Sequence, residues 1–136
     1  MSASTMGSAA AEHGDAERLI RDLHAARVRG DLTALCGLFA EQGRFEIRGA
    51  SADKPIAITA TSLAEFRPWL SMMVKVFRLS NYGLDSLVVE WPRAAARWRV
   101  DIYSKVTGVT VATELVDLVE IGANRIHSYC EFFVPR

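Results

Sequence analysis

The strongest constraint on the fold is a change of hydrophobic period after Asn81. Beyond that residue, apolar and polar side chains alternate through residues 84–91, 95–106, 109–121 and 125–134. Alternation with a period of two is typical of strands that bury one face. Short turn-forming segments separate the four stretches. The second half of the chain is therefore predicted to form four consecutive antiparallel strands.

The first half of the chain has helical spacing instead. Apolar residues recur every three to four positions in residues 16–28, 31–40 and 63–78, which predicts three helices. Asp31 is a candidate N-cap for the second helix, and Ser62 with Glu65 forms a capping box for the third. Short strands are expected at residues 44–48 and 56–60. This order predicts an α+β fold in which three helices cover one face of a curved, mostly antiparallel sheet, leaving a cone with a ligand cavity at its mouth.

Composition limits the domain count and the possible partners. The chain has 136 residues, of which 50% are hydrophobic, and its formal net charge is +0. We expect a disordered lead-in at residues 1–13 and a single domain at 14–136. A balanced charge argues against a nucleic-acid partner, and no apolar run approaches the roughly 18 residues of a membrane span.

The two cysteines and the start of the chain bear on compartment and cofactor. Cys36 and Cys130 lie in apolar segments without a neighbouring Cys/His cluster, so neither a metal nor another cofactor is expected. Two free thiols fit a reducing compartment, and the first residues lack the basic start and apolar core of a secretory signal. A cytoplasmic location is therefore predicted.

Three segments of the chain resemble one superfamily. They are RGDLTALCGLFAEQGRFEI (residues 29–47), the capped third helix, and LVDLVEIGANRIHSYCEFF (residues 115–133). Together they resemble the nuclear transport factor 2-like superfamily, also called SnoaL-like or ketosteroid isomerase-like. The resemblance implies a cystatin-like α+β roll. The superfamily includes isomerases, dehydratases, cyclases, hydrolases and transport factors, so the fold alone does not give a function.

Within that superfamily, RVDIYSK (residues 99–105) is similar to the Arg-x-Asp strand of limonene epoxide hydrolases. The resemblance implies that Arg99 bridges two acidic residues, with Asp101 as the acid for the epoxide oxygen and Glu131 as the base for water. The tyrosine and asparagine with which that family positions water are replaced here by Phe45 and Ile47.

The isomerase pattern matches at one position. Its general base falls on Ile47 and its helix tyrosine on Leu23, whereas its second acid, a hydrogen-bond donor to the substrate oxygen, falls on Asp117. A lone acid in an apolar strand is either a pocket group or a cross-strand partner for Arg99 or Tyr129.

The fold resemblance directs the polar row of Arg99 and Asp101 toward the interior of the cone. Trp98, Val100 and Ile102 then make the outer sheet face partly apolar, which predicts a two-fold homodimer. The alternatives are a solvated Arg99–Asp101 pair and a rim position for Glu131. His24 is expected on the surface of its helix.

These observations predict a cofactor-independent enzyme for a small apolar molecule, with epoxide hydrolysis as its most specific form. The alternatives are a non-catalytic protein that binds a hydrophobic ligand, and an isomerase, cyclase or dehydratase that uses Asp101 or Asp117. The catalytic candidates are Arg99, Asp101 and Glu131. The predicted substrate-binding residues are Phe45, Ile47, Trp69, Tyr103, Leu115, Asp117, Tyr129 and Phe133.

Overall fold

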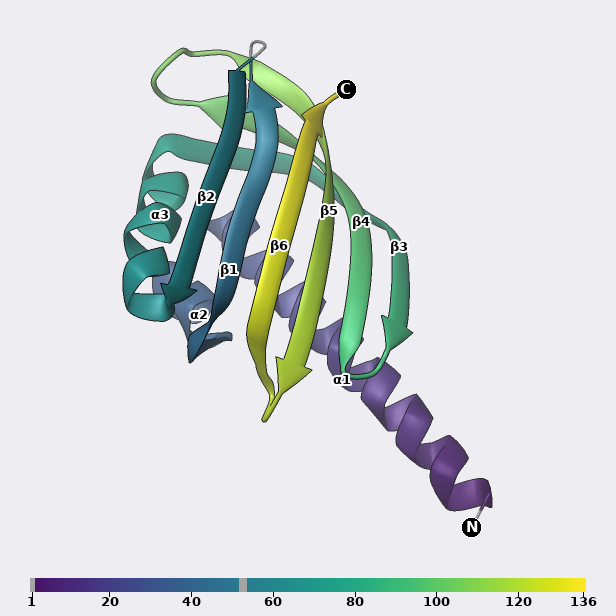
Figure 1. Cartoon of the computed structure of the whole chain (residues 1–136). Helices are drawn as coiled ribbons and strands as arrows, with labels where there is room; N and C mark the ends of the chain where they lie inside the picture. The colour runs from purple at the N-terminus through teal and green to yellow at the C-terminus, as the bar shows by residue number, and fades with distance from the viewer. Residues whose placement is uncertain (1, 52–53) are drawn as a thin grey trace.

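The fold is an open six-stranded sheet with helices on one face (Figure 1). The structure, a computed structural model, describes the backbone of residues 2–51 and 54–136 and the side chains of 9–50 and 55–136. Its elements are α1 (Ser2–Arg29), α2 (Leu32–Gly37), β1 (Phe39–Ser51), β2 (Lys54–Ser62), α3 (Leu63–Val76), β3 (Phe77–Glu90), β4 (Arg93–Ser104), β5 (Thr110–Gly122) and β6 (Arg125–Pro135).

The strand order places the C-terminal strands at the centre of the sheet. The order is β2-β1-β6-β5-β4-β3, and every neighbouring pair is antiparallel except β1 with β6. The strands curve around α1, which lies behind the sheet in Figure 1, with α3 behind the β2 edge. The predicted α+β cone, with helices on one face of a mostly antiparallel sheet, is confirmed.

Two helix starts follow the capping residues identified in the sequence. Asp31 caps α2, where its Oδ1 atom accepts from the Ala34 amide at 3.0 Å. Ser62 caps α3, where its Oγ atom accepts from the Glu65 amide at 3.1 Å. Each cap satisfies a backbone N–H that has no partner inside its helix.

Several predicted boundaries are wrong. α1 begins at Ser2 and so overlaps the expected lead-in at residues 1–13, whose disorder stays a prediction, while Met1 lies outside the described residues. The second helix ends at Gly37, because Phe39 already pairs with Ile126 in the sheet. β3 begins at Phe77, within the residues expected to end the third helix, and Asn81, with a φ of 54°, lies at an irregularity inside this strand.

Most of the core lies between α1, α3 and the concave face of the sheet. A large cluster is built on Ile20, Leu23, Phe39, Phe45 and Phe66. A smaller one contains Trp98, Val100 and Leu115, and half-buried apolar side chains from β3, β4 and β6 pack against it. Burying such side chains is the main favourable contribution to folding.

Candidate active site

Two carboxylates occupy adjacent positions on the inner face of the sheet. Asp117 on β5 is the register partner of Glu131 on β6, and Glu131 is also paired with Ile47 on β1. Asp117 is 0% exposed and Glu131 is 2% exposed. Acidic residues are almost never fully buried without partners, so the groups that contact them define the site.

Tyr129 joins the two carboxylates. Its hydroxyl lies 2.8 Å from Glu131 Oε1 and 3.3 Å from Asp117 Oδ1, and the residue is 2% exposed. The hydroxyl has one proton and therefore donates to one carboxylate at a time. Burial, together with the charges of Asp117 and Glu131, raises the pKa of Tyr129 well above its ordinary value. The phenol therefore stays protonated and can relay a proton between the two acids.

Arg27 at the end of α1 holds the second carboxylate. Its Nη1 atom donates to Glu131 Oε1 in a buried ion pair, and its guanidinium lies 5.4 Å from the centroid of the Trp98 ring. Burial lowers the pKa of Arg27, but the charges of Glu131, Tyr129 and Asp117 outweigh it and the net direction is upward. Burial raises the pKa of Glu131 and is only partly opposed by Arg27. Glu131 therefore keeps its proton to a higher pH than an ordinary glutamate does.

His24, one helical turn before Arg27, holds the first carboxylate. Its Nε2 atom lies 2.8 Å from Asp117 Oδ2, and its Nδ1 atom lies 2.6 Å from the hydroxyl of Tyr82 on β3. With Asp117 ionised, Nε2 carries the proton and Nδ1 accepts from the tyrosine hydroxyl. Tyr82 is half-buried, so this chain of hydrogen bonds leads from the buried carboxylate toward the surface.

The next row of the inner face is apolar. Trp98, Leu115, Phe133 and Gly49 follow one another across β4, β5, β6 and β1 in register. A Cβ atom on Gly49 would lie 2.5 Å from the Phe133 ring, so only glycine lets that ring lie flat against β1. Apolar walls and buried acids thus lie side by side, as in many small-molecule sites.

The predicted orientation of Arg99 and Asp101 is wrong. They share the outer face of β4 because Trp98 and Val100, both 0% exposed, take the inner face. Arg99 pairs with Asp85, and Asp101 accepts from Asn81 Nδ2 at 2.7 Å. The bulky apolar row releases more free energy on burial than the charged row. Arg99 therefore bridges neither Asp101 nor Glu131.

The other predicted site residues form two groups, one on the inner face of the sheet and one away from the carboxylates. Phe45, Ile47, Leu115 and Tyr129 are buried on the inner face, and Phe133 is half-buried there. Trp69 lies on α3 and is 42% exposed. Tyr103 is half-buried, shares the strand parity of Arg99 and contacts the guanidinium of Arg78, 5.9 Å from its ring centroid. Neither Trp69 nor Tyr103 contacts the carboxylate pair.

Sequence reasoning missed His24 and Arg27, which contact the carboxylates, and Tyr82, which bonds to His24. His24 is buried at 0% exposure, so its predicted surface position is wrong. The signal was present in α1, where positions 20, 23, 24 and 27 have the spacing of one helix face and two of them are polar. Polar residues on an otherwise buried stripe indicate buried partners.

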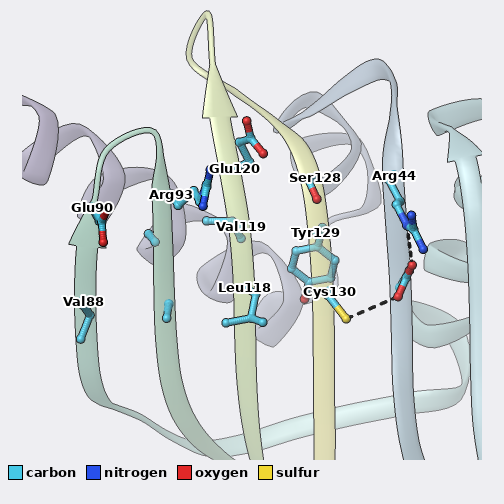
Figure 2. A pocket seen from close by; sticks show the side chains of 13 residues that line it. Arg44, Val88, Glu90, Arg93, Leu118, Val119, Glu120, Ser128, Tyr129 and Cys130 are labelled. Atoms are coloured by element: carbon cyan, nitrogen blue, oxygen red, sulfur yellow. Dashed lines mark hydrogen bonds and ion pairs between the residues drawn. The ribbon is translucent and has the colours of Figure 1, made fainter.

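The outer face of the sheet has a separate hollow of about 560 Å³ (Figure 2). Its floor includes Val88, Ala95 and Leu118, and Cys130 lies at its edge, 3.7 Å from Glu46. Arg44 Nε lies 2.6 Å from Glu46, and this arginine lowers the pKa of that carboxyl. The hollow is on the opposite face of the sheet from the side chain of Asp117, and Tyr129 is among the residues that line it.

Within residues 9–50 and 55–136, no group of three or more His, Cys, Asp and Glu side chains is arranged to hold a metal ion. No helix in the described part of the chain is long and apolar enough to cross a membrane.

Comparison with solved structures identifies the fold. No family model and no curated protein matches the chain. A putative isomerase from Bacillus subtilis superposes with a TM-score of 0.78 at 19% identity, covering 90% of this chain and 88% of its own. A nuclear transport factor 2-like protein from Burkholderia xenovorans gives 0.72 at 20% identity, covering 90% and 91%. An LEH-like epoxide hydrolase from M. tuberculosis gives 0.72 at 12% identity, covering 90% and 85%.

The chain therefore has the nuclear transport factor 2-like fold, as its resemblance to that superfamily implied. Similar structures carry names of isomerases, an epoxide hydrolase and a putative polyketide cyclase. This is a fold of small-molecule enzymes and ligand-binding proteins. At these identities the similarity establishes the fold, and any activity has to be argued from the buried site.

Proposed function

We propose that this chain is a cofactor-independent enzyme that uses Asp117 and Glu131 as an acid–base pair on a small apolar molecule. One observation carries the proposal. Two buried carboxylates are joined by the Tyr129 hydroxyl, and each has its own partner, His24 for Asp117 and Arg27 for Glu131. Two acids in different environments can hold different protonation states at one pH, which acid–base catalysis requires.

Epoxide hydrolysis is the most specific reaction that this pair supports. Glu131, whose pKa is raised by burial, is the proton donor to the epoxide oxygen as the ring C–O bond breaks. Asp117 takes a proton from the water whose oxygen bonds to the ring carbon. Epoxide and water become a diol, and Tyr129 returns the proton from Asp117 to Glu131. Arg27 stabilises the carboxylate that Glu131 leaves behind. These roles replace those that the sequence resemblance implied for Arg99 and Asp101.

Turnover of an epoxide panel tests this proposal. Terpene, styrene-type, steroid and fatty-acid epoxides are incubated with the wild type and with Glu131→Gln, and the diols are quantified by chiral chromatography. We expect a diol from at least one epoxide and a loss of roughly 10²–10⁴-fold in the variant, the usual contribution of a general acid. No diol from any of the four classes would contradict the hydrolase proposal.

Proton transfer within a ligand is a second candidate, favoured by the chain from Asp117 through His24 to Tyr82. A carboxylate that exchanges its proton along such a chain suits an isomerase, cyclase or dehydratase. A β,γ-unsaturated ketone, followed by the absorbance of its conjugated product, distinguishes this activity from hydrolysis. Binding of apolar ligands without any turnover would favour the non-catalytic alternative.

A second copy of the chain is the proposed partner for the outer sheet face. Large apolar side chains are exposed there, including Leu118 at 46% and Phe132 at 42%. Arg93 and Glu120, which are register partners across β4 and β5, line the hollow beside these apolar side chains, and a two-fold interface would cover the apolar part of this face. The apolar residues of this face differ from the predicted Trp98, Val100 and Ile102, the first two of which are buried inside.

Light scattering after size exclusion tests the dimer. We expect a mass near 30 kDa, twice the 15.0 kDa of one chain. Leu118→Lys is expected to give the 15.0 kDa species, because each copy would bury a lysine in the apolar interface. Val106→Lys is the control, since Val106 is 79% exposed in the turn after β4 and away from the hollow. A wild type that elutes only at 15.0 kDa would contradict the dimer.

The cysteines support a cytoplasmic location for the enzyme. Cys36 and Cys130 are both free thiols, one buried and one half-buried. Reducing compartments keep thiols in this state. Oxidation of both cysteines in protein purified from cells under alkylating conditions would contradict this location.

A further inference from the structure

Trp98 has a buried hydrogen-bond donor without a partner. The residue is 0% exposed, and its indole Nε1 finds no acceptor among the residues whose side chains are described. Indole nitrogen is only a donor, and buried polar groups are paired in the great majority of cases. A donor left unpaired in a core is costly, so this one calls for an acceptor that the chain itself does not supply.

The position of Trp98 connects this donor with the carboxylate pair. Its ring stacks on the His24 ring, with centroids 4.2 Å apart and planes at 29°. The guanidinium of Arg27 lies 5.4 Å from its centroid on the way to Glu131. The ring is therefore packed between the two residues of α1 that hold the acids. An acceptor at Nε1 would lie next to the proposed acid–base site.

The surroundings of Trp98 provide the apolar part of a binding site. Val100 and Leu115 pack with it in one cluster, and the half-buried Tyr82, Ile102 and Phe133 cover that cluster. Since Trp98 has no exposed area, these covering side chains have to move apart for a ligand to reach it. Covering groups that are half-buried can rearrange more easily than fully packed ones.

We infer that the indole Nε1–H of Trp98 binds an oxygen of the ligand, and that the ligand is an apolar molecule with a hydrogen-bond-accepting oxygen, such as an epoxide, a ketone or an ether. This inference rests on the proposed function in placing the ligand on the inner face of the sheet. It goes further by naming the ligand's polar group and the residue that recognises it. A pure hydrocarbon of the same shape would leave the donor unpaired and bind more weakly.

A matched pair of probes tests the inference without any reaction. Carvone is a ketone with the carbon skeleton of limonene, a hydrocarbon, and neither contains an epoxide. The protein is labelled with ¹⁵N-tryptophan, which gives one indole signal for each of the three tryptophans. Trp69→Phe and Trp91→Phe each remove one signal and so assign the third to Trp98. Both probes are titrated up to their solubility limits.

We expect carvone to move the Trp98 indole proton downfield and limonene to leave it near its starting position. We also expect carvone to bind roughly five- to ten-fold more tightly, the effect of one neutral hydrogen bond. Trp98→Phe should remove this preference while keeping the affinity for limonene. If that variant fails to fold, the comparison of the two probes on the wild type is sufficient.

A Trp98 signal that stays in place with both probes, or moves equally with both, would overturn the inference, since the donor would then be paired with water or unused. The result is separable from the proposed function. A carvone-induced shift without hydrolysis of any epoxide would support the ligand class and refute the hydrolase. Hydrolysis with no carvone-induced shift would refute the role of Trp98 and leave the hydrolase standing.

Discussion

Replacing Arg27 with methionine is expected to lower the free energy of unfolding by about 3–5 kcal/mol, the usual cost of removing one partner of a buried ion pair. The side chains of Arg27 and Glu131 are 9% and 3% exposed, so water does not replace the lost guanidinium. Glu131 would remain buried, with only Tyr129 to compensate it. Urea denaturation followed by circular dichroism measures the loss.

The loss in Arg27→Met is also expected to depend on pH. Burial raises the pKa of Glu131 in the folded state above the ordinary value near 4.5 even with Arg27 present, and more so without it. Between the unfolded and folded pKa values, the folded chain binds more protons than the unfolded chain, so stability falls as pH rises through that window. The variant should therefore lose more stability at pH 8 than at pH 5.

Two controls make this prediction specific. Glu131→Gln added to Arg27→Met should restore much of the stability, because position 131 then carries no charge that lacks its partner. Arg99→Met removes the exposed ion pair with Asp85 and should cost at most about 1 kcal/mol. A loss below about 1 kcal/mol in Arg27→Met, independent of pH, would indicate that the pair behaves like a surface salt bridge.

The fold could be predicted because local signals agreed with one another. Alternation identified the last three strands within two residues at each end, and the capping residues Asp31 and Ser62 marked two helix starts. The start of β3 was missed because Asn81 and Gly83, which usually indicate a turn, accommodate an irregularity inside the strand. The local sequence cannot distinguish a turn from an irregularity inside a strand, since both use the backbone freedom of such residues.

The site was harder to predict because a period of two divides a strand into two faces without saying which one is inside. Glu131, Asp117 and Tyr129 were assigned to the interior, and they are buried together. Arg99 and Asp101 were also placed there, because of a short motif resemblance. Burial of the large Trp98 side chain instead turns Arg99 and Asp101 to the outer face. The partners on α1 come from 93 and 104 positions away in the chain, a separation beyond any local pattern.

Asp117→Asn is expected to reduce kcat/KM by roughly 10²–10⁴-fold on the epoxide that the wild type hydrolyses fastest. Asparagine has the shape of aspartate and still accepts from Tyr129, but it cannot take a proton from water. Its amide also faces His24 Nε2, so the histidine must move its proton to Nδ1 and donate it to Tyr82. The variant should therefore fold, as thermal unfolding would verify.

The most direct test of the buried site compares Asp117→Asn with Asp101→Asn in the same turnover assay. Both changes remove one carboxylate from a strand of the same sheet, but Asp117 is 0% exposed on the inner face and Asp101 bonds to Asn81 on the outer face. We predict that Asp117→Asn loses turnover and that Asp101→Asn keeps it within about two-fold, as distant surface changes usually do. Loss of turnover in Asp101→Asn with full activity in Asp117→Asn would contradict the account and return the chemistry to the outer row of β4.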